Sequence, residues 1–296
     1  MAVGPLYHGA GARRLSIGPG LWFNPAMARM TLKDRWVLVT GASSGLGREI
    51  ARDVASRHGG NLILVARRGD RLRELADELA GRHNVQARPI AADLSNARDV
   101  ERVFEDSRAI GPVYGAVLNA GITHFGAHQE LPWEGFESLL ATNVTATVKF
   151  VHHLVPHMLD HDLGGGIMLV TSMTGLVPTP YQTAYSASKA FLTAFGEGLY
   201  HELSDQNVSL TTFAPGGIAT EMTEKTGLQE VFGNSPQIME APRCARLAVD
   251  AMVARRYLAV PGLFNQFQLF LPRLGPRKLA TGVVAGVYRK AMRKNP

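Results

Sequence analysis

Short apolar runs alternate with longer segments of helical periodicity from residue 36 to residue 262, and few folds accommodate such an alternation. Each run is about five residues long, and most are bounded by Gly, Pro or a charged residue, as expected of a buried strand. Strands that alternate with helices are typical of βαβ units, in which helices cover both faces of a parallel sheet. The predicted strands lie at residues 36–40, 61–65, 85–90, 113–118, 167–171, 208–213 and 257–260.

Helices are predicted between these strands. A long helix is expected at 133–159 and another at 184–203. Ser95 is predicted to be the N-cap of a helix at 97–109. No linker or internal repeat interrupts 36–262, so we expect one α/β domain whose ligand binds at the carboxyl ends of the strands.

The net charge of +6 is unevenly distributed along the chain. Residues 1–36 carry a net charge of +4 and residues 251–296 carry +9, which leaves −7 for residues 37–250. A basic tail suggests an anionic partner such as a membrane surface or nucleic acid. An acidic central domain argues against nucleic-acid recognition, and no nucleic-acid partner is expected.

Residues 1–35 are rich in Gly and Pro, and we expect them to form a disordered leader. Met27 and Met30 are both positions where translation could begin. The single cysteine, Cys244, excludes an intrachain disulfide and a cysteine metal cluster, which suits a reducing compartment. Because no apolar run is long enough to span a membrane and the apolar segment of a secretory signal is missing, we expect a cytoplasmic protein.

A glycine motif, G-x-x-x-G-x-G, stands between the first predicted strand and a helical segment. Glycines let the backbone turn tightly and approach a pyrophosphate, whose charge the amides at the helix N-terminus can bind. The spacing differs from G-x-G-x-x-G, and the alternative is a plain strand-to-helix turn. The residues expected to contact a nucleotide here are Gly41, Ser43, Ser44, Gly45, Leu46 and Gly47.

Arg67 and Arg68 follow the second predicted strand, where a NAD-selective site would place an acid. An arginine can pair with a 2′-phosphate and stack on adenine, so the pair favours NADP(H) over NAD(H). The alternative is a solvated basic turn. The next two strand ends could contact adenine and the nicotinamide ribose, although the acid there could equally begin a helix. These residues are Asp93, Leu94, Asn119, Ala120 and Gly121.

Tyr185 and Lys189 lie four residues apart, on one face of a predicted helix. An ammonium near a phenol favours the phenolate, so the pair could exchange protons near neutral pH. Ser172, at the end of the fifth predicted strand, could donate a hydrogen bond to a substrate carbonyl oxygen. Asn143, within the long predicted helix, could hold a water next to Lys189. Taken singly, each of these residues could equally be structural.

Together these motifs resemble the short-chain dehydrogenase/reductase superfamily in its short single-domain form. The resemblance implies a Rossmann-type, doubly wound parallel sheet of about seven strands in three α/β/α layers. It also implies hydride transfer between a nicotinamide cofactor and a carbonyl carbon. The matching positions, in the family's order, are Thr40-Gly41-x-x-x-Gly45-x-Gly47, Asp93, Asn119-Ala120-Gly121, Asn143, Ser172, Tyr185-x-x-x-Lys189 and Pro215-Gly216.

The resemblance implies a role for each catalytic residue. Tyr185 is the general acid/base, and Lys189 lowers its pKa and binds the nicotinamide ribose. Ser172 polarises the carbonyl, and Asn143 anchors a relay water. Leu118 departs from the many relatives that have a second Asn there, but it leaves the Asn-Ala-Gly step intact. A homodimer or homotetramer assembled through the helices carrying Asn143 and Tyr185 is also implied.

The segment after Pro215-Gly216 completes the cofactor site with Ile218 and with Thr220, which resembles a family position that contacts the nicotinamide carboxamide. Apolar residues recur through 217–240, which favours a hydrophobic carbonyl or alcohol substrate beneath a mobile lid. Alternatively, these residues pack on the domain and select nothing. Candidate residues of the substrate wall are His124, Phe125, Met173, Thr174 and Gln182.

Residues 263–296 begin with apolar residues at helical spacing and end with basic residues. This segment could bind a membrane surface peripherally, or its apolar face could pack on the domain or at a subunit interface. His153, His157 and His161 recur every four residues, and we interpret them as a polar helix face rather than as zinc ligands.

The sequence therefore predicts an NADP(H)-dependent oxidoreductase that interconverts a ketone or aldehyde and an alcohol on an apolar substrate. Reduction is the favoured direction because NADPH is generally the reducing pool. One alternative is a non-catalytic NADP(H) sensor or scaffold on the same fold, and a narrower one is a 3-oxoacyl-thioester reductase.

Overall fold

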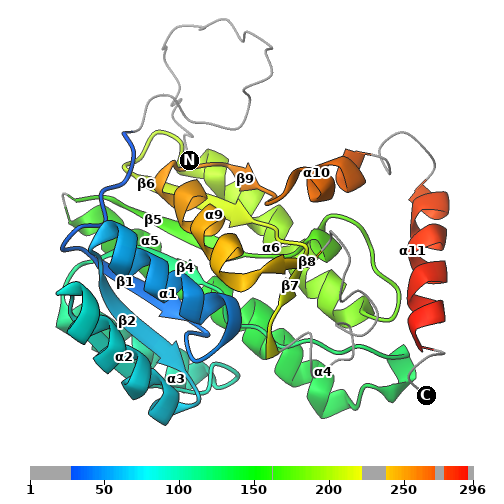
Figure 1. Cartoon of the computed structure of the whole chain (residues 1–296), viewed down its shortest axis with the longest axis horizontal. Coiled ribbons are helices and arrows are strands. Elements are labelled where there is room, and N and C mark those ends of the chain that lie inside the picture. The colour runs from blue at the N-terminus through cyan, green and yellow to red at the C-terminus, as the bar shows by residue number, and fades with distance from the viewer. Residues whose placement is uncertain (1–27, 162, 222–237, 271–276, 293–296) are drawn as a thin grey trace, which may run out of the picture.

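The structure is a computed structural model that describes residues 28–161, 163–221, 238–270 and 277–292. Its main feature is a seven-stranded parallel sheet in the order β3-β2-β1-β4-β5-β6-β9, which confirms the predicted α/β fold (Figure 1). The strands of this sheet are β1 (Trp36–Thr40), β2 (Asn61–Ala66), β3 (Ala87–Ala91), β4 (Val113–Leu118), β5 (Gly165–Val170), β6 (Val208–Phe213) and β9 (Leu258–Ala259).

Helices cover both faces of the sheet and so form the predicted α/β/α layers. On one face lie α1 (Gly45–His58), α2 (Gly69–His83) and α9 (Ala241–Val253). On the other face lie α3 (Ala97–Ile110), α5 (Ala146–Asp160) and α6 (Thr183–Glu202).

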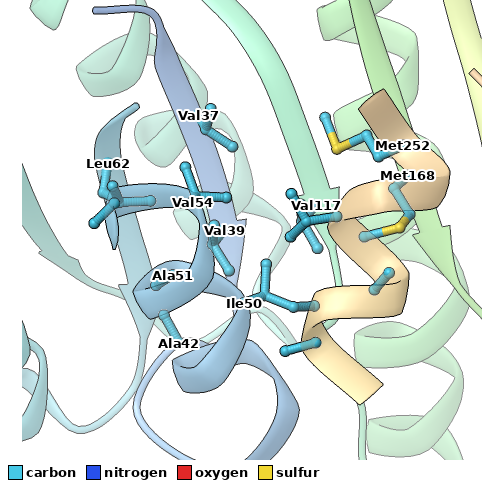
Figure 2. Packing of buried hydrophobic residues seen from close by; sticks show 14 of the residues in the cluster. Val37, Val39, Ala42, Ile50, Ala51, Val54, Leu62, Val117, Met168 and Met252 are labelled. Carbon is cyan, nitrogen blue, oxygen red and sulfur yellow. The ribbon is translucent and has the colours of Figure 1, made fainter. Parts of the chain in front are cut away.

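The pleat of each strand divides the core into two clusters. Val37 and Val39 of β1 pack in the cluster beneath α1, whereas Leu38 packs in the cluster on the opposite face. Figure 2 shows Ile50 and Val54 of α1 among the side chains that pack with Val37 and Val39. All five side chains are fully buried, and each contributes about 1.5–3 kcal/mol to folding. Because both faces of the strand are covered, the run is apolar throughout instead of alternating.

A crevice forms between β1 and β4, where the order in which successive strands are added to the sheet reverses. β1 and β4 are neighbours, with β2 and β3 placed outward on one side and β5, β6 and β9 on the other. The connections therefore leave β1 and β4 in opposite directions, and this opens a binding crevice at their carboxyl ends.

The long helix predicted at 133–159 is present, but it is not regular. α4 (Trp133–Leu140) and α5 are joined by a π-helical turn at Ala141–Thr145, and Asn143 lies within this turn. A π turn widens the helix locally and is frequent at functional sites. The apolar periodicity of the sequence does not predict such a turn.

Packing begins before residue 36. Met30 and Leu32 are buried in the core, and the amide of Met30 donates to the carbonyl oxygen of Val253 in α9 at 2.9 Å. The prediction of a disordered leader is therefore wrong for residues 28–35. The remainder of that leader, 1–27, lies outside the described residues.

The segment after β6 contains elements that the sequence does not predict. A small parallel sheet pairs β7 (Gly217–Ala219) with β8 (Ile238–Glu240), and most of the predicted lid between them lies outside the described residues. Two helices, α10 (Leu263–Phe270) and α11 (Arg277–Met292), follow the main sheet. In Figure 1, α11 (red) stands at one end of the molecule, beyond β7 and β8. Within the described ranges, every helix is too short or too polar to cross a membrane.

Candidate active site

A cavity of about 1150 Å³ opens at the carboxyl ends of β1, β4, β5 and β6. This volume exceeds the range of about 300–1,000 Å³ that is typical of ligand pockets, as expected of a site that holds two molecules. Of the predicted site residues, Gly47 and Asn143 do not line the cavity. The others do, and they are Gly41, Ser43, Ser44, Gly45, Leu46, Arg67, Arg68, Asp93, Leu94, Asn119, Ala120, Gly121, Ser172, Tyr185, Lys189, Pro215, Gly216, Ile218 and Thr220.

The glycine loop packs tightly against the end of β4. A Cβ at Gly41 would lie 2.8 Å from Asn119 Nδ2, and a Cβ at Gly47 would overlap the carbonyl oxygen of Gly41. Gly41 also has a φ of 70°, which residues with side chains rarely adopt. Asn119 Nδ2 donates to the carbonyl oxygen of Thr40 at 3.0 Å, so the ends of β1 and β4 are fixed relative to each other.

The N-terminus of α1 lies next to this loop, and the side chain of its N-cap residue accepts no hydrogen bond from the first amides of the helix. The first turn contains no acid, and Ser44 makes no side-chain capping bond. The first N–H groups of a helix have no partner within the helix, and they carry the positive end of its dipole. The space between Gly41 and α1 is therefore one that could hold the phosphates of a dinucleotide.

Arg67 and Arg68 both line the cavity, but they differ in exposure and contacts. Arg67 is exposed, whereas the half-buried Arg68 donates to Ser44 Oγ at 2.6 Å and to Glu221 Oε2 at 2.9 Å. Arg71 donates to Glu221 Oε1 at 2.5 Å. Hydrogen bonds from the two guanidinium groups lower the pKa of the Glu221 carboxyl to about 2. Glu221 and Arg71 were missed from sequence because they lie 150 residues apart and no local motif links them.

Asp93 lines the cavity and also begins the turn into α3. Its Oδ1 accepts hydrogen bonds from the amide of Ser95 at 3.0 Å and from the Ser95 hydroxyl at 2.8 Å. The prediction that Ser95 is the N-cap is wrong, because the side chain of Asn96 accepts from the Arg98 amide at 2.9 Å instead. Leu94 is buried at the same corner.

Ser172, Tyr185 and Lys189 converge on one side of the cavity. Ser172 follows β5, and the other two residues lie one turn apart on α6. Lys189 is buried, and its Nζ lies 5.7 Å from the ring centroid of Tyr185 and donates to the carbonyl oxygen of Val170 at 2.9 Å. The proton donors are thus held by strand β5 and helix α6, both of which are rigid elements.

Burial controls the protonation of this pair. It raises the pKa of Tyr185 to about 12, against a smaller lowering by a hydrogen bond with Ser172. Burial also lowers the pKa of Lys189 to about 8. The predicted lowering of the Tyr185 pKa is therefore not found in this pocket, because desolvation of the phenolate outweighs the stabilising contacts. At neutral pH the pair is a phenol and an ammonium.

Asn143 lies behind the lining and organises the loop after β4. Its Oδ1 accepts from the Ile122 amide at 2.8 Å, and its Nδ2 donates to the Ile122 carbonyl oxygen at 3.0 Å and to Ser188 Oγ at 3.1 Å. A Cβ at Gly121 would lie 3.2 Å from Asn143 Oδ1 and 3.4 Å from Lys189 Nζ. The Asn143 side chain therefore uses most of its hydrogen-bonding capacity within the protein, next to Lys189.

The wall of the cavity differs in part from the prediction. Met173, Thr174 and Gln182 line it, whereas His124 and Phe125 do not. Sequence reasoning missed the residues that α10 and α11 contribute, because helical spacing alone does not show what an extension packs against. These residues are Asn265, Gln268, Leu269, Leu279, Val283, Val284, Val287 and Tyr288.

Asn265 is notable among them for an unpaired polar atom. Its side chain is buried, and its Nδ2 donates to the carbonyl oxygen of Pro261 at 2.8 Å. Its Oδ1 has no partner among the described residues. A Cβ at Gly216 would lie 3.0 Å from this oxygen, so Asn265 stands against the predicted nicotinamide edge of the site.

The histidines of α5 connect that helix to strand β4 and to helix α3. His157 Nε2 accepts from the Val113 amide at 3.1 Å, and His153 stacks on Phe104 with ring centroids 4.9 Å apart. Over the described part of the chain, no three His, Cys, Asp or Glu side chains are grouped as metal ligands.

The parallel sheet, the glycine loop and the helix N-terminus at its crevice define a Rossmann-type dinucleotide-binding protein. Residues 35–231 match the family model described as short chain dehydrogenase. The chain belongs to the short-chain dehydrogenase/reductase family.

Known relatives agree with this assignment. Very-long-chain 3-oxoacyl-CoA reductases of Scheffersomyces stipitis and Anas platyrhynchos are 34% and 30% identical to the chain, over 60% and 73% of its length. The chain covers 54% and 66% of these relatives, and so less than two thirds of either. A solved short-chain dehydrogenase from Sphingobium yanoikuyae in complex with NADPH is 27% identical with a TM-score of 0.73, and the match covers 88% of this chain and 96% of that one.

Proposed function

We propose that the protein is an NADP(H)-dependent oxidoreductase that interconverts a ketone or aldehyde and the corresponding alcohol on an apolar substrate. The observation that carries the proposal is that Ser172, Tyr185 and Lys189 line the same cavity as the glycine loop. A hydroxyl donor, a phenol and an ammonium beside a dinucleotide site are the groups that carbonyl reduction needs.

The residues present fit a dinucleotide. Gly41 leaves room for a close approach of phosphate, and α1 offers amides without a competing acid or capping side chain. When bound, NADPH would supply a hydride for the carbonyl carbon.

In the reductive direction, two hydroxyls would meet the negative charge that develops on the substrate oxygen. Ser172 would donate a hydrogen bond, and Tyr185 would transfer its proton to the oxygen as the new C–H bond forms. Because burial raises the pKa of Tyr185 to about 12, the phenol enters the reaction protonated. The protonated phenol supports reduction as the favoured direction.

Lys189 and Asn143 would hold this arrangement in place. The Lys189 ammonium would stabilise the phenolate that proton transfer leaves, and its remaining N–H donors would bind the nicotinamide ribose. Asn143, next to Lys189, would position the Gly121–Ile122 backbone at the cofactor edge. The relay water predicted for Asn143 would have to share a side chain that is already hydrogen-bonded.

The preference for NADP(H) rests on the basic residues at the end of β2. Arg67 is exposed at the cavity and could pair with a 2′-phosphate. Arg68 and Arg71 already bind an internal anion, the carboxylate of Glu221. We propose that the 2′-phosphate takes over these guanidinium groups from Glu221.

Other residues bear on the compartment, the assembly and the domain boundary of the protein. Cys244 is a buried free thiol, which suits the cytoplasm. Trp133 of α4 and Phe191 of α6 are 66% and 49% exposed, and these helices supply an apolar surface for a homodimer. We propose a catalytic domain that ends near residue 262 and an extension, 263–296, that adds to its site.

The test is NADPH oxidation with a panel of apolar ketones and aldehydes. Wild type is expected to turn over at least one of them, and Tyr185→Phe is expected to lose at least about a hundredfold in kcat. Tyr200→Phe is the matched control, because Tyr200 lies on the same helix outside the cavity. Full activity of Tyr185→Phe would show that the proposed mechanism is wrong.

Two other candidates remain distinguishable. A 3-oxoacyl thioester is favoured by the names of the two relatives and by the apolar cavity wall, and activity restricted to thioesters would establish it. A non-catalytic sensor would bind NADPH but oxidise none in the presence of any carbonyl compound.

A further inference from the structure

Helix α11 faces the catalytic residues across the cavity. Leu279, Val283 and Val287 recur every four residues, so they share one face of the helix, and all three line the cavity that contains Tyr185. Ala285 lies on the opposite side of the helix and does not line the cavity. These three side chains of α11 therefore point toward the cavity, whereas Leu263, Phe264 and Phe267, which begin the predicted apolar part of the extension, lie on α10 and are exposed.

An aromatic contact joins α11 to the loop after β4. The ring of Tyr288 lies 5.8 Å from the ring of Phe125, centroid to centroid, with the ring planes at 56°. Phe125 belongs to the loop after β4 that also carries Gly121, so α11 is joined to the cofactor side of the site.

The pKa of Tyr288 is affected by Tyr185. Burial and, to a lesser extent, the charge of Tyr185 raise the pKa of Tyr288 to about 12. The two phenols are thus near enough for their charges to interact. Tyr288 places one end of α11 close to the position of the reacting carbonyl.

The apolar face of α11 meets open space instead of a packed core. Leu279 is 67% exposed, Val283 is 71% exposed and Val287 is 46% exposed, although all three line the cavity. Apolar side chains gathered around a cleft mark a binding groove more often than free surface. An apolar ligand between Tyr185 and α11 would remove these side chains from water.

We propose that α11 is the far wall of the substrate site and selects a carbonyl compound whose apolar body extends from Tyr185 to Val283. This inference rests on the proposed function, since it assigns the substrate to the same cavity. Two chemistries share the required shape: a long aliphatic chain and a rigid polycyclic ketone. Tyr288 is a positioning residue that anchors the wall at its catalytic end.

The test measures ketone binding separately from turnover. Methyl ketones from hexanone to tetradecanone, and a decalone as the polycyclic probe, are titrated by calorimetry into the full-length protein saturated with NADP+. Each methylene that becomes buried is expected to tighten binding about fourfold until the groove is filled. The proposal would be overturned if all the methyl ketones and the decalone bound with the same Kd.

Variants of α11 locate the effect. Val283→Asp is expected to weaken the tightest-binding ketone at least about tenfold and hexanone about twofold or less, because only a long ligand reaches Val283. Val283→Phe should shorten the chain length that binds best. Ala285→Asp adds the same charge on the opposite side and is expected to change neither Kd. Val283 is mostly exposed, so its replacement does not disrupt the core.

The outcomes separate this proposal from the proposed function. If the Kd depends on chain length in wild type but not in Val283→Asp, and wild type oxidises no NADPH, the proposed oxidoreductase function is refuted. The role of α11 as a wall of the binding site is then retained. If wild type oxidises NADPH with these ketones but Val283→Asp and wild type bind them with equal Kd values, the role of α11 as a wall of the substrate site is refuted. Loss of sedimentation with anionic phospholipid vesicles in Val283→Asp, with ketone binding unchanged, would assign α11 to a membrane surface instead.

Discussion

Replacing Glu221 by Gln is expected to tighten NADPH binding and leave NADH binding unchanged. Glu221 holds Arg68 at 2.9 Å and Arg71 at 2.5 Å, at the edge of the cavity where a 2′-phosphate would bind. By our proposal, its carboxylate would compete with the phosphate for the same two guanidinium groups. Gln keeps the size of the side chain but removes its charge.

The magnitude follows from the exposure of the two ion pairs. The side chains of Glu221, Arg68 and Arg71 are 35%, 39% and 45% exposed, so solvent screens both pairs. Such pairs contribute about 0.2–1 kcal/mol each, and releasing two of them is expected to lower the Kd of NADPH about 2- to 30-fold. Arg68 stays in place in the variant because Ser44 also holds it at 2.6 Å.

The assay is a fluorescence titration of NADPH and NADH into wild type, Glu221→Gln and Glu78→Gln. Glu78 is the matched control, because it pairs with Arg52 at 2.7 Å and does not line the cavity. An unchanged or weaker NADPH affinity in Glu221→Gln, or an equal gain for NADH, would refute the exchange of anions.

Three further predictions concern the site. Because the pKa of Lys189 is lowered to about 8 while that of Tyr185 is raised to about 12, kcat/KM for reduction should be constant below about pH 7 and fall as the ammonium is lost above about pH 8; a rise over this range would contradict the assignment. Asn143→Ala removes two hydrogen bonds to the half-buried backbone of Ile122 and should lower the free energy of unfolding by about 1–3 kcal/mol in a urea titration, whereas a loss below about 0.5 kcal/mol would argue against this role of Asn143. Asn265→Leu removes a buried acceptor at the nicotinamide edge and should weaken NADPH binding about fivefold, and an unchanged Kd would remove Asn265 from the cofactor site.

The sheet could be predicted from sequence because its signals are local. The central strands are buried on both faces, so apolar runs such as that of β1 are continuous and short, whereas the doubly wound strand order was expected only from the resemblance to the family. β7, β8 and the π turn at Asn143 lack such signals. β7 is only three residues long, and the π turn places Asn143 in hydrogen bonds with Ile122 and Ser188, which are distant in the sequence.

The catalytic side of the site could be predicted because its residues follow strand ends or lie one helical turn apart. Ser172 and the pair Tyr185 and Lys189 needed only the order of strands to converge. The contribution of Tyr288 and the anion at Arg68 depend on long-range docking of α11 and Glu221, which no spacing in the sequence encodes. The raised pKa of Tyr185 likewise depends on burial, which outweighs the local charge expected from Lys189.

The most direct test of the mechanism is deuterium transfer from NADPH that carries deuterium at both C4 positions of the nicotinamide. Wild type is incubated with the ketone that binds best, and the alcohol is analysed by mass spectrometry. We expect deuterium on the carbinol carbon with wild type, and at least about a hundredfold slower transfer by Tyr185→Phe that still binds NADPH with wild-type affinity. Transfer by Tyr185→Phe at the wild-type rate, or an alcohol product without deuterium, would contradict it.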